Sequence, residues 1–146
     1  MTWKQMVATL ALGVSLGWFG LPTMAQGGNT FKGRLSKYPV DAKMVPIIVG
    51  TGNVTSTLAG TRLTINGTFE GLGTTATTAQ LHDSKFRGTH GPVIAELTVS
   101  KAASGTVSGQ VTLTPEQVES LKAGRLYVQV QSEAGKEGHL WGWLLP

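Results

Sequence analysis

The segment TTAQLHDSKFRGTHGPVIAEL, residues 77–97, decides the fold of this chain. Apolar and polar residues alternate at its start, which places Ala79 and Leu81 on one face of an extended strand and His82 on the other. A polar, basic loop containing glycine follows at residues 83–92, and alternation then resumes to the end of the segment. The segment therefore predicts two β-strands joined by a polar loop.

The rest of the chain after residue 25 has the same character. Glycine, threonine, serine and β-branched residues dominate, and short alternating runs are bounded by Gly, Asn, Asp or Pro. Further strands are expected at residues 30–36, 52–58, 62–70, 105–113, 126–130 and 139–145. About eight short strands that each bury one face predict two antiparallel sheets packed against each other.

One helical segment interrupts the strands, at about residues 114–123. Thr114 is a suitable N-cap, Pro115 suits the first helical position, and Gln117 stands where a capping box requires Glu or Gln. Gly124 provides the C-terminal stop. The spacing predicts a helix of about two turns.

The first 25 residues resemble a signal peptide. Lys4 precedes an uncharged, mostly apolar run at residues 7–21, and Thr23 and Ala25 are small residues at the positions that a signal peptidase reads. We expect cleavage after Ala25, which leaves residues 26–146 as one β-sandwich domain. The alternative is a retained anchor, although the run is shorter than the roughly 20 residues that span a bilayer.

The charge of the chain limits the class of partner, and its cysteine content limits how the domain is stabilised. The chain has 12 Lys and Arg, 8 Asp and Glu, and no cysteine. Removal of Lys4 with the leader lowers the formal charge from +4 to about +3. The basic residues are scattered, so nucleic-acid binding is not expected, while attraction to an acidic polysaccharide or an anionic membrane surface stays open. Without disulfides, the domain depends on its hydrophobic core.

Several motifs, in order, resemble the chordin-type (CHRD) domain over residues 31–144. They are Thr78 to His82, Gly91-Pro92, Leu113 to Gln117, and Leu121 to Gln131. The resemblance implies an immunoglobulin-like, Greek-key antiparallel β-sandwich in an exported protein. It also implies a binding or structural module, because the family is not known for catalysis.

The chain departs from the family pattern at three motifs. Members commonly carry His-x-His where this chain has Gln80 and His82. They commonly carry Val-Asn-Val-His where this chain has Val-Gln-Val-Gln, with Gln131 in the place of the histidine. Their usual arginine near the C-terminus is Trp141 here. A site that depended on clustered imidazoles or on that arginine is therefore in doubt.

The alternative function is copper or zinc binding by histidines. His82, His90 and His139 are the only histidines and lie on three separate segments, so a β-sandwich could bring two of them together. No His-x-His pair is present, and we expect no cofactor. A hydrolase is the lowest-ranked alternative, because no nucleophile elbow occurs and acidic residues are few. No catalytic residue is assigned.

Two groups of residues are candidates for partner binding. Trp141 and Trp143 share one face of the last strand, and Lys85, Phe86 and Arg87 form a basic triplet with an aromatic centre in the loop. We expect a protein partner or a polysaccharide of the cell envelope or extracellular space, with no stable membrane span after cleavage. The predicted location is periplasmic, extracellular or at the cell surface.

Export makes a direct prediction about the N-terminus. Because the small residues before Gln26 suit signal peptidase, the mature protein is expected to begin at Gln26. N-terminal sequencing of protein recovered from the host envelope or medium measures this. A mature chain that begins at Met1 in the membrane fraction would instead identify a retained anchor.

Overall fold

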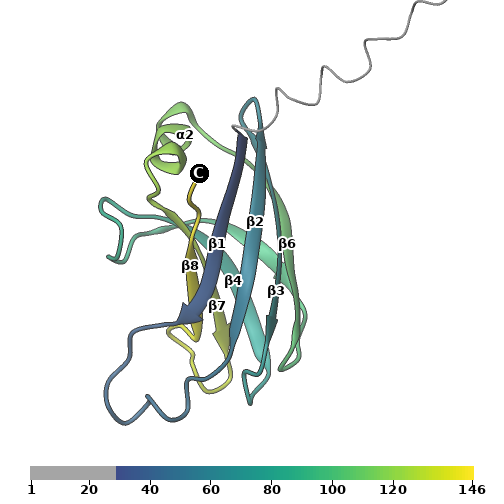
Figure 1. Cartoon of the computed structure of the whole chain (residues 1–146), viewed down its shortest axis with the longest axis vertical. Helices are drawn as coiled ribbons and strands as arrows, with labels where there is room; N and C mark the ends of the chain where they lie inside the picture. The colour runs from purple at the N-terminus through teal and green to yellow at the C-terminus, as the bar shows by residue number, and fades with distance from the viewer. Residues whose placement is uncertain (1–28) are drawn as a thin grey trace, which may run out of the picture.

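A computed structural model of the chain describes residues 29–146, which form a closed barrel of eight antiparallel strands with one short helix (Figure 1). The predicted signal peptide lies outside the described residues. The strands are β1 (Thr30–Lys37), β2 (Thr51–Ala59), β3 (Arg62–Glu70), β4 (Ala76–Asp83), β5 (Val93–Val99), β6 (Gly105–Thr112), β7 (Leu126–Ser132) and β8 (Leu140–Trp143), and the helix is α2 (Pro115–Lys122).

The immunoglobulin-like β-sandwich that the sequence predicted is wrong, because two strands close the sheets into a barrel. β1 pairs with β2 through residues 30–35 and with β8 through Ser36 and Lys37. β5 pairs with β4 through residues 93–97 and with β6 through residues 98–99. One sheet consists of β1, β2, β3, β6 and β5, and the other of β1, β8, β7, β4 and β5. Because β1 and β5 belong to both sheets, neither sheet keeps the free edges of an open sandwich.

The strand order around the barrel is β1-β2-β3-β6-β5-β4-β7-β8. β4, β5 and β6 are consecutive neighbours, and β6 returns to lie beside β3, which is a Greek-key connection. The registers place paired residues on the same face of the barrel wall, so each strand presents alternate residues to the core and to solvent.

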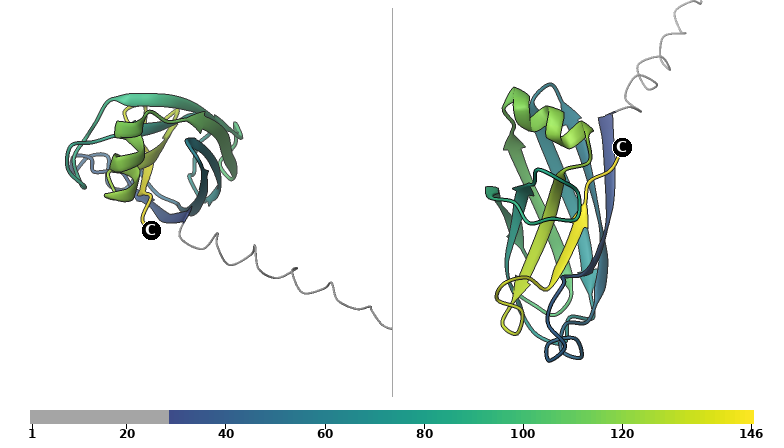
Figure 2. Two further views of the ribbon diagram at one scale, coloured as in Figure 1. Left: turned by 90° about the horizontal axis from the view of Figure 1, so that it is seen from above. Right: turned by 90° about the vertical axis from the view of Figure 1, so that its left-hand side faces the viewer.

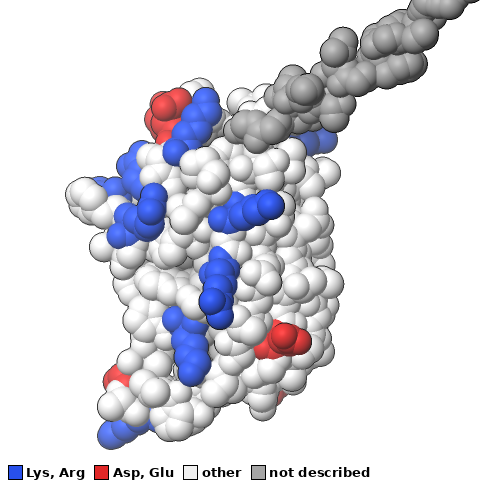
Figure 3. Space-filling model, viewed as in Figure 1, with Lys and Arg blue, Asp and Glu red and all other residues white. Residues whose placement is uncertain are grey.

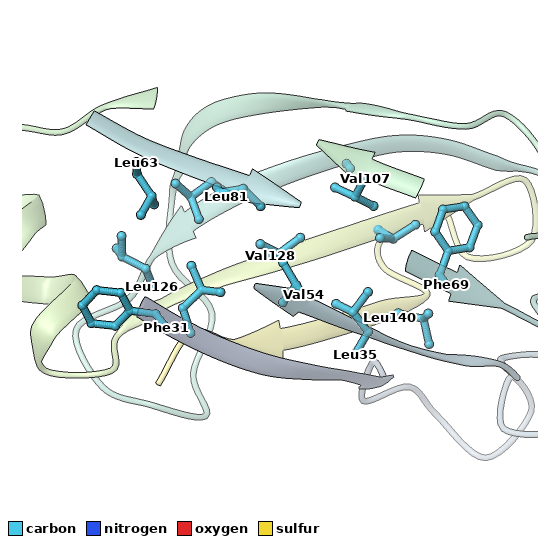
Figure 4. Close-up of a cluster of buried hydrophobic side chains, with 14 of the residues drawn as sticks. Phe31, Leu35, Val54, Leu63, Phe69, Leu81, Val107, Leu126, Val128 and Leu140 are labelled. Carbon is cyan, nitrogen blue, oxygen red and sulfur yellow. The ribbon is translucent and has the colours of Figure 1, made fainter. Parts of the chain in front are cut away.

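Inward-facing side chains from all sides of the barrel meet in one core. Leu63 and Leu81 lie opposite Leu126 and Phe31, and Phe69 fills the other end (Figure 4). Except for Phe31 and Phe69, which are 2% and 3% exposed, these side chains are completely buried. Because the chain has no cysteine, this apolar burial is the main stabilising term of the fold.

Helix α2 covers one end of the barrel (Figure 2). Its capping box forms as the sequence predicts: the Gln117 amide donates to the Thr114 hydroxyl at 3.2 Å, and the Gln117 side chain accepts from the Thr114 amide at 2.9 Å. Leu121 is completely buried against the core. Among the described residues, no helix has the length and apolar character needed to cross a bilayer.

A buried histidine fixes the long segment between β1 and β2, residues 38–50. His139 Nε2 lies 2.6 Å from the Val49 carbonyl oxygen, and a carbonyl only accepts, so this nitrogen carries the proton. Its Nδ1 therefore accepts from the Ser132 hydroxyl at 2.7 Å, and that hydroxyl in turn accepts from the Gly135 amide at 2.8 Å. These bonds hold the segment against the β7–β8 turn.

Closure of the barrel depends on the close approach of β1 to β8. A Cβ atom at Gly33 would overlap the Trp143 carbonyl, and the backbone carbonyl of Arg34 approaches Gly142 in the same way. Both neighbours are backbone atoms, which cannot rotate away. The two glycines therefore allow the first and last strands to pair.

We expect Gly33→Ala to lower the free energy of unfolding by about 1–3 kcal/mol, the usual cost of overpacking. Urea denaturation followed by tryptophan fluorescence measures this. Ser36→Ala, on the exposed side of the same strand, is the control and should change stability by less than about 0.5 kcal/mol. Equal stability of the Gly33 variant and the wild type would contradict this account of closure.

Candidate functional site

An aromatic cluster occupies the outer face of strands β4, β7 and β8. The register aligns His82 with Tyr127 and Trp143 across the three strands, and it aligns Trp141 with the neighbouring outward position of β7. Ring centroids lie 4.5 Å apart for Tyr127 and Trp143, 5.4 Å for Tyr127 and Trp141, and 5.4 Å for the two tryptophans. The rings pack at the separations that favour aromatic pairs.

The β1–β2 segment and the β4–β5 loop complete this cluster. The Tyr38 ring lies edge-on to Trp141 at 5.2 Å, and its hydroxyl is 2.6 Å from His90 Nδ1. We call Tyr38, His82, His90, Tyr127, Trp141 and Trp143 the aromatic cluster. Tyr38, His82 and Tyr127 are its buried members, whereas both tryptophans are half-buried and His90 is exposed. The cluster thus presents an apolar, partly exposed surface.

The loop of residues 84–92 is tied to the barrel at several points. The Ser84 amide donates to the Arg125 carbonyl at 3.0 Å, and Arg87 Nε donates to the Gly124 carbonyl at 3.3 Å. The Gly91 amide donates to the Tyr127 hydroxyl at 3.1 Å. Gly91 also passes so close to the Asp83 carbonyl that a Cβ atom would overlap it. These contacts fasten the start, the middle and the end of the loop to the barrel.

His82 is the most unusual side chain of the site. Its Nδ1 lies 2.8 Å from the Gly91 carbonyl and so carries the proton, while its ring stacks on Tyr127 at 4.7 Å. Among the described residues, His82 Nε2 is the one buried side-chain nitrogen or oxygen without a hydrogen-bond partner. Burial lowers the pKa of His82, and nearby His90 lowers it further, against the opposing effect of the Gly91 bond.

The three histidines proposed as metal ligands are not equivalent. His82, on β4, stacks on Tyr127, and His90, in the loop that follows β4, packs against Trp141. His139 is completely buried, and both of its ring nitrogens are engaged in hydrogen bonds. Within residues 29–146, no group of three or more His, Cys, Asp or Glu is arranged to hold a metal ion. Metal binding by His82, His90 or His139 stays a prediction, and His139 would have to give up a hydrogen bond to take part.

A serine–histidine hydrogen bond is present, but its setting is structural. Ser132 and His139 are both completely buried, and the second imidazole nitrogen donates to the Val49 backbone carbonyl and not to a carboxylate. A nucleophile must reach its substrate, and its base is normally oriented by a third group that stabilises the imidazolium. The geometry instead supports the role of His139 in fixing the β1–β2 segment.

The structure places the predicted partner-binding residues in two adjoining parts of the site. Trp141 and Trp143 belong to the aromatic cluster, while Lys85, Phe86 and Arg87 are exposed on the loop. The sequence analysis missed Tyr38 and Tyr127. Tyr127 could have been found from its place between Leu126 and Val128 in the alternating strand, which puts it on the outward face, whereas Tyr38 lies in an irregular segment whose pattern carries no such signal.

The two buried histidines make stability depend on pH. Burial lowers the pKa of His82 and of His139, so the unfolded chain binds protons at a higher pH than the folded chain does. The free energy of unfolding should therefore be highest above about pH 6.5, the unfolded-state pKa, and should fall below it. The decline is at most about 1.4 kcal/mol per pH unit for each histidine.

Urea denaturation between about pH 8 and pH 5.5 measures this decline and stays above the range in which carboxylates titrate. The variant His82→Gln should show a shallower decline than the wild type, because one of the two buried imidazoles is gone. A wild-type stability that is constant or increases as the pH falls through this range would contradict the prediction.

Comparison with known proteins identifies the domain. The pattern of the CHRD domain family matches residues 36–144, and no curated protein and no solved structure was found to match the chain. Gln80, Gln131 and Trp141, where the resemblance implies two histidines and an arginine, lie on the strands β4, β7 and β8 that carry the aromatic cluster. From its sequence and the extent of this match, the chain belongs to the CHRD domain family.

Proposed function

We propose that this protein is an exported, non-catalytic binding module that docks a protein partner through the loop of residues 84–92 and the adjoining aromatic cluster. Its location would be periplasmic, extracellular or at the cell surface. The signal-like features of residues 1–25 support export.

The observation that carries the proposal is the exposure of Phe86. This side chain is 70% exposed, the highest value among the large hydrophobic residues of the described chain. It stands between the exposed cations Lys85 and Arg87. An exposed aromatic residue beside cations resembles the anchors that dominate binding energy at protein interfaces, where Trp, Tyr and Arg are enriched.

The loop is pre-organised for such a contact. Ser84 Oγ donates to the Phe86 carbonyl at 2.8 Å, and the Thr89 hydroxyl donates to the same carbonyl at 2.7 Å. Together with the ties of Arg87 to Gly124 and of Gly91 to Tyr127, these bonds hold the backbone around Phe86. Little conformational entropy is then lost when a partner binds.

The charge of the loop indicates the character of the partner. Lys85 and Arg87 favour a surface that has carboxylates around an apolar pocket, and such charges act mainly on the rate and specificity of association. The half-buried rings of Trp141 and Trp143 add apolar area beside the loop. The partner should therefore offer a hydrophobic pocket for Phe86 with an acidic rim.

Affinity capture from the host's own envelope extract and secretome tests the proposal. Wild-type protein should recover a reproducible protein partner, and Phe86→Ala should weaken binding of that isolated partner by at least about tenfold, as expected for an interface anchor. Ile47→Ala is the matched control, because Ile47 is another exposed large hydrophobic residue, on the β1–β2 segment. Equal binding of the partner by wild type and Phe86→Ala would overturn the proposal.

A further inference from the structure

A second surface, on the opposite side of β1 from the aromatic cluster, has the construction of a ligand site. Outward residues of β1, β2, β3 and β6 align in two rows across the barrel wall. One row is Arg34, Asn53, Thr68 and Thr106, and the other is Lys32, Thr55, Asn66 and Ser108. With neighbouring strands about 4.8 Å apart, each row is about 14 Å long.

The six members of these rows on β2, β3 and β6 line an open hollow of about 570 Å³, whose floor is the backbone at Gly67 and Val107. Five of the six side chains are exposed and Ser108 is half-buried. All six end in a hydroxyl or amide group, so the hollow offers both hydrogen-bond donors and acceptors.

One side of the hollow ends at a pair of cations. Lys32 pairs with Thr55 and Arg34 pairs with Asn53, so both cations occupy the β1 ends of the two rows and both are exposed. Figure 3 shows a column of basic side chains on the face where Figure 1 places β1, with a mostly uncharged surface beside it over β2. The hollow itself is lined by uncharged residues.

We propose that this hollow binds a short stretch of an acidic polysaccharide, with sugar hydroxyls over Asn53, Thr55, Asn66, Thr68, Thr106 and Ser108 and a sugar carboxylate at Lys32 and Arg34. Sugars carry many hydroxyl groups that both donate and accept, which matches a lining made of amides and hydroxyls. The guanidinium of Arg34 can bind a carboxylate with two parallel hydrogen bonds.

The open shape of the hollow determines the kind of affinity to expect. A shallow, solvated site leaves much of the ligand in water, so a single stretch of sugar binds weakly. Charge attraction at exposed cations is also screened by salt. Tight attachment would then arise from several copies of the protein on one polymer, because avidity multiplies weak contacts.

The site is independent of the proposed protein contact, because its residues lie on β1, β2, β3 and β6 and not on the loop of residues 84–92. The hollow also contains two Asn-x-Thr sequences, Asn53-Val54-Thr55 and Asn66-Gly67-Thr68. Glycosylation of either asparagine would fill it. The test therefore requires a host that does not glycosylate asparagine.

The experiment is an NMR titration of ¹⁵N-labelled protein, expressed from the full chain in a bacterial host, with tetragalacturonate as the acidic probe and maltotetraose as the neutral one. Tetragalacturonate should shift the amide signals of residues 53–55, 66–68 and 106–108, and added salt should weaken its binding. Maltotetraose should bind at least about tenfold more weakly, because it lacks the carboxylates that Lys32 and Arg34 would bind.

Variants locate the site. Arg34→Gln and Asn66→Leu should each weaken tetragalacturonate binding by about tenfold or more, the first by removing a cation and the second by removing an amide and partly filling the hollow. Lys136→Gln, an exposed cation of the β7–β8 turn, and Thr57→Leu, on the neighbouring outward position of β2, are the matched controls and should bind as the wild type does. Retained amide dispersion verifies folding.

The inference would be overturned by no shift with tetragalacturonate, by equal binding of both sugars, or by unchanged binding in Arg34→Gln and Asn66→Leu. Shifts confined to residues 141–143 would also overturn it, since they would place the sugar on the aromatic cluster. Phe86→Ala should bind tetragalacturonate normally, so loss of the protein contact and loss of the sugar site are separately measurable.

Discussion

The pairing of β1 with β8 is the constraint on which the rest of the structure depends. It joins the two sheets along one side of the barrel, as β5 joins them along the other. The close backbone approach that it requires is met by glycine at positions 33 and 142. Because no disulfide supports the fold, this pairing and the enclosed apolar core together stabilise the closed barrel.

The same closure separates two outer surfaces of different chemistry. On one side of β1, β8 carries the half-buried rings of Trp141 and Trp143, and β7 carries the buried ring of Tyr127 beside the loop of residues 84–92. On the other side, β2, β3 and β6 carry only small hydroxyl and amide side chains around the hollow. β1 contributes Lys32 and Arg34 between them. A rigid barrel of this kind lets both surfaces be occupied at once, because neither overlaps the other.

Much of the local structure was predictable, and the long-range arrangement was not. The alternation at Arg62–Glu70 and the capping residues around Pro115 are local signals, and the structure has β3 and α2 at those places. Alternation looks the same in a sandwich and in a barrel, so it could not reveal that β1 meets β8. The place of Tyr38 in the cluster and the alignment of Asn53 with Thr68 depend on tertiary contacts and on strand register, which no single segment encodes.

The union of the first strand with the last has a consequence for how the protein acquires its structure. Residues 36 and 141 are partners, so their contact closes a loop that includes nearly the whole domain. Closing so long a loop is entropically costly, and contacts between residues far apart in sequence slow folding. A ribosome-bound chain that lacks residues 140–143 has no partner for this edge of β1. The finished barrel can therefore form only after synthesis has reached β8.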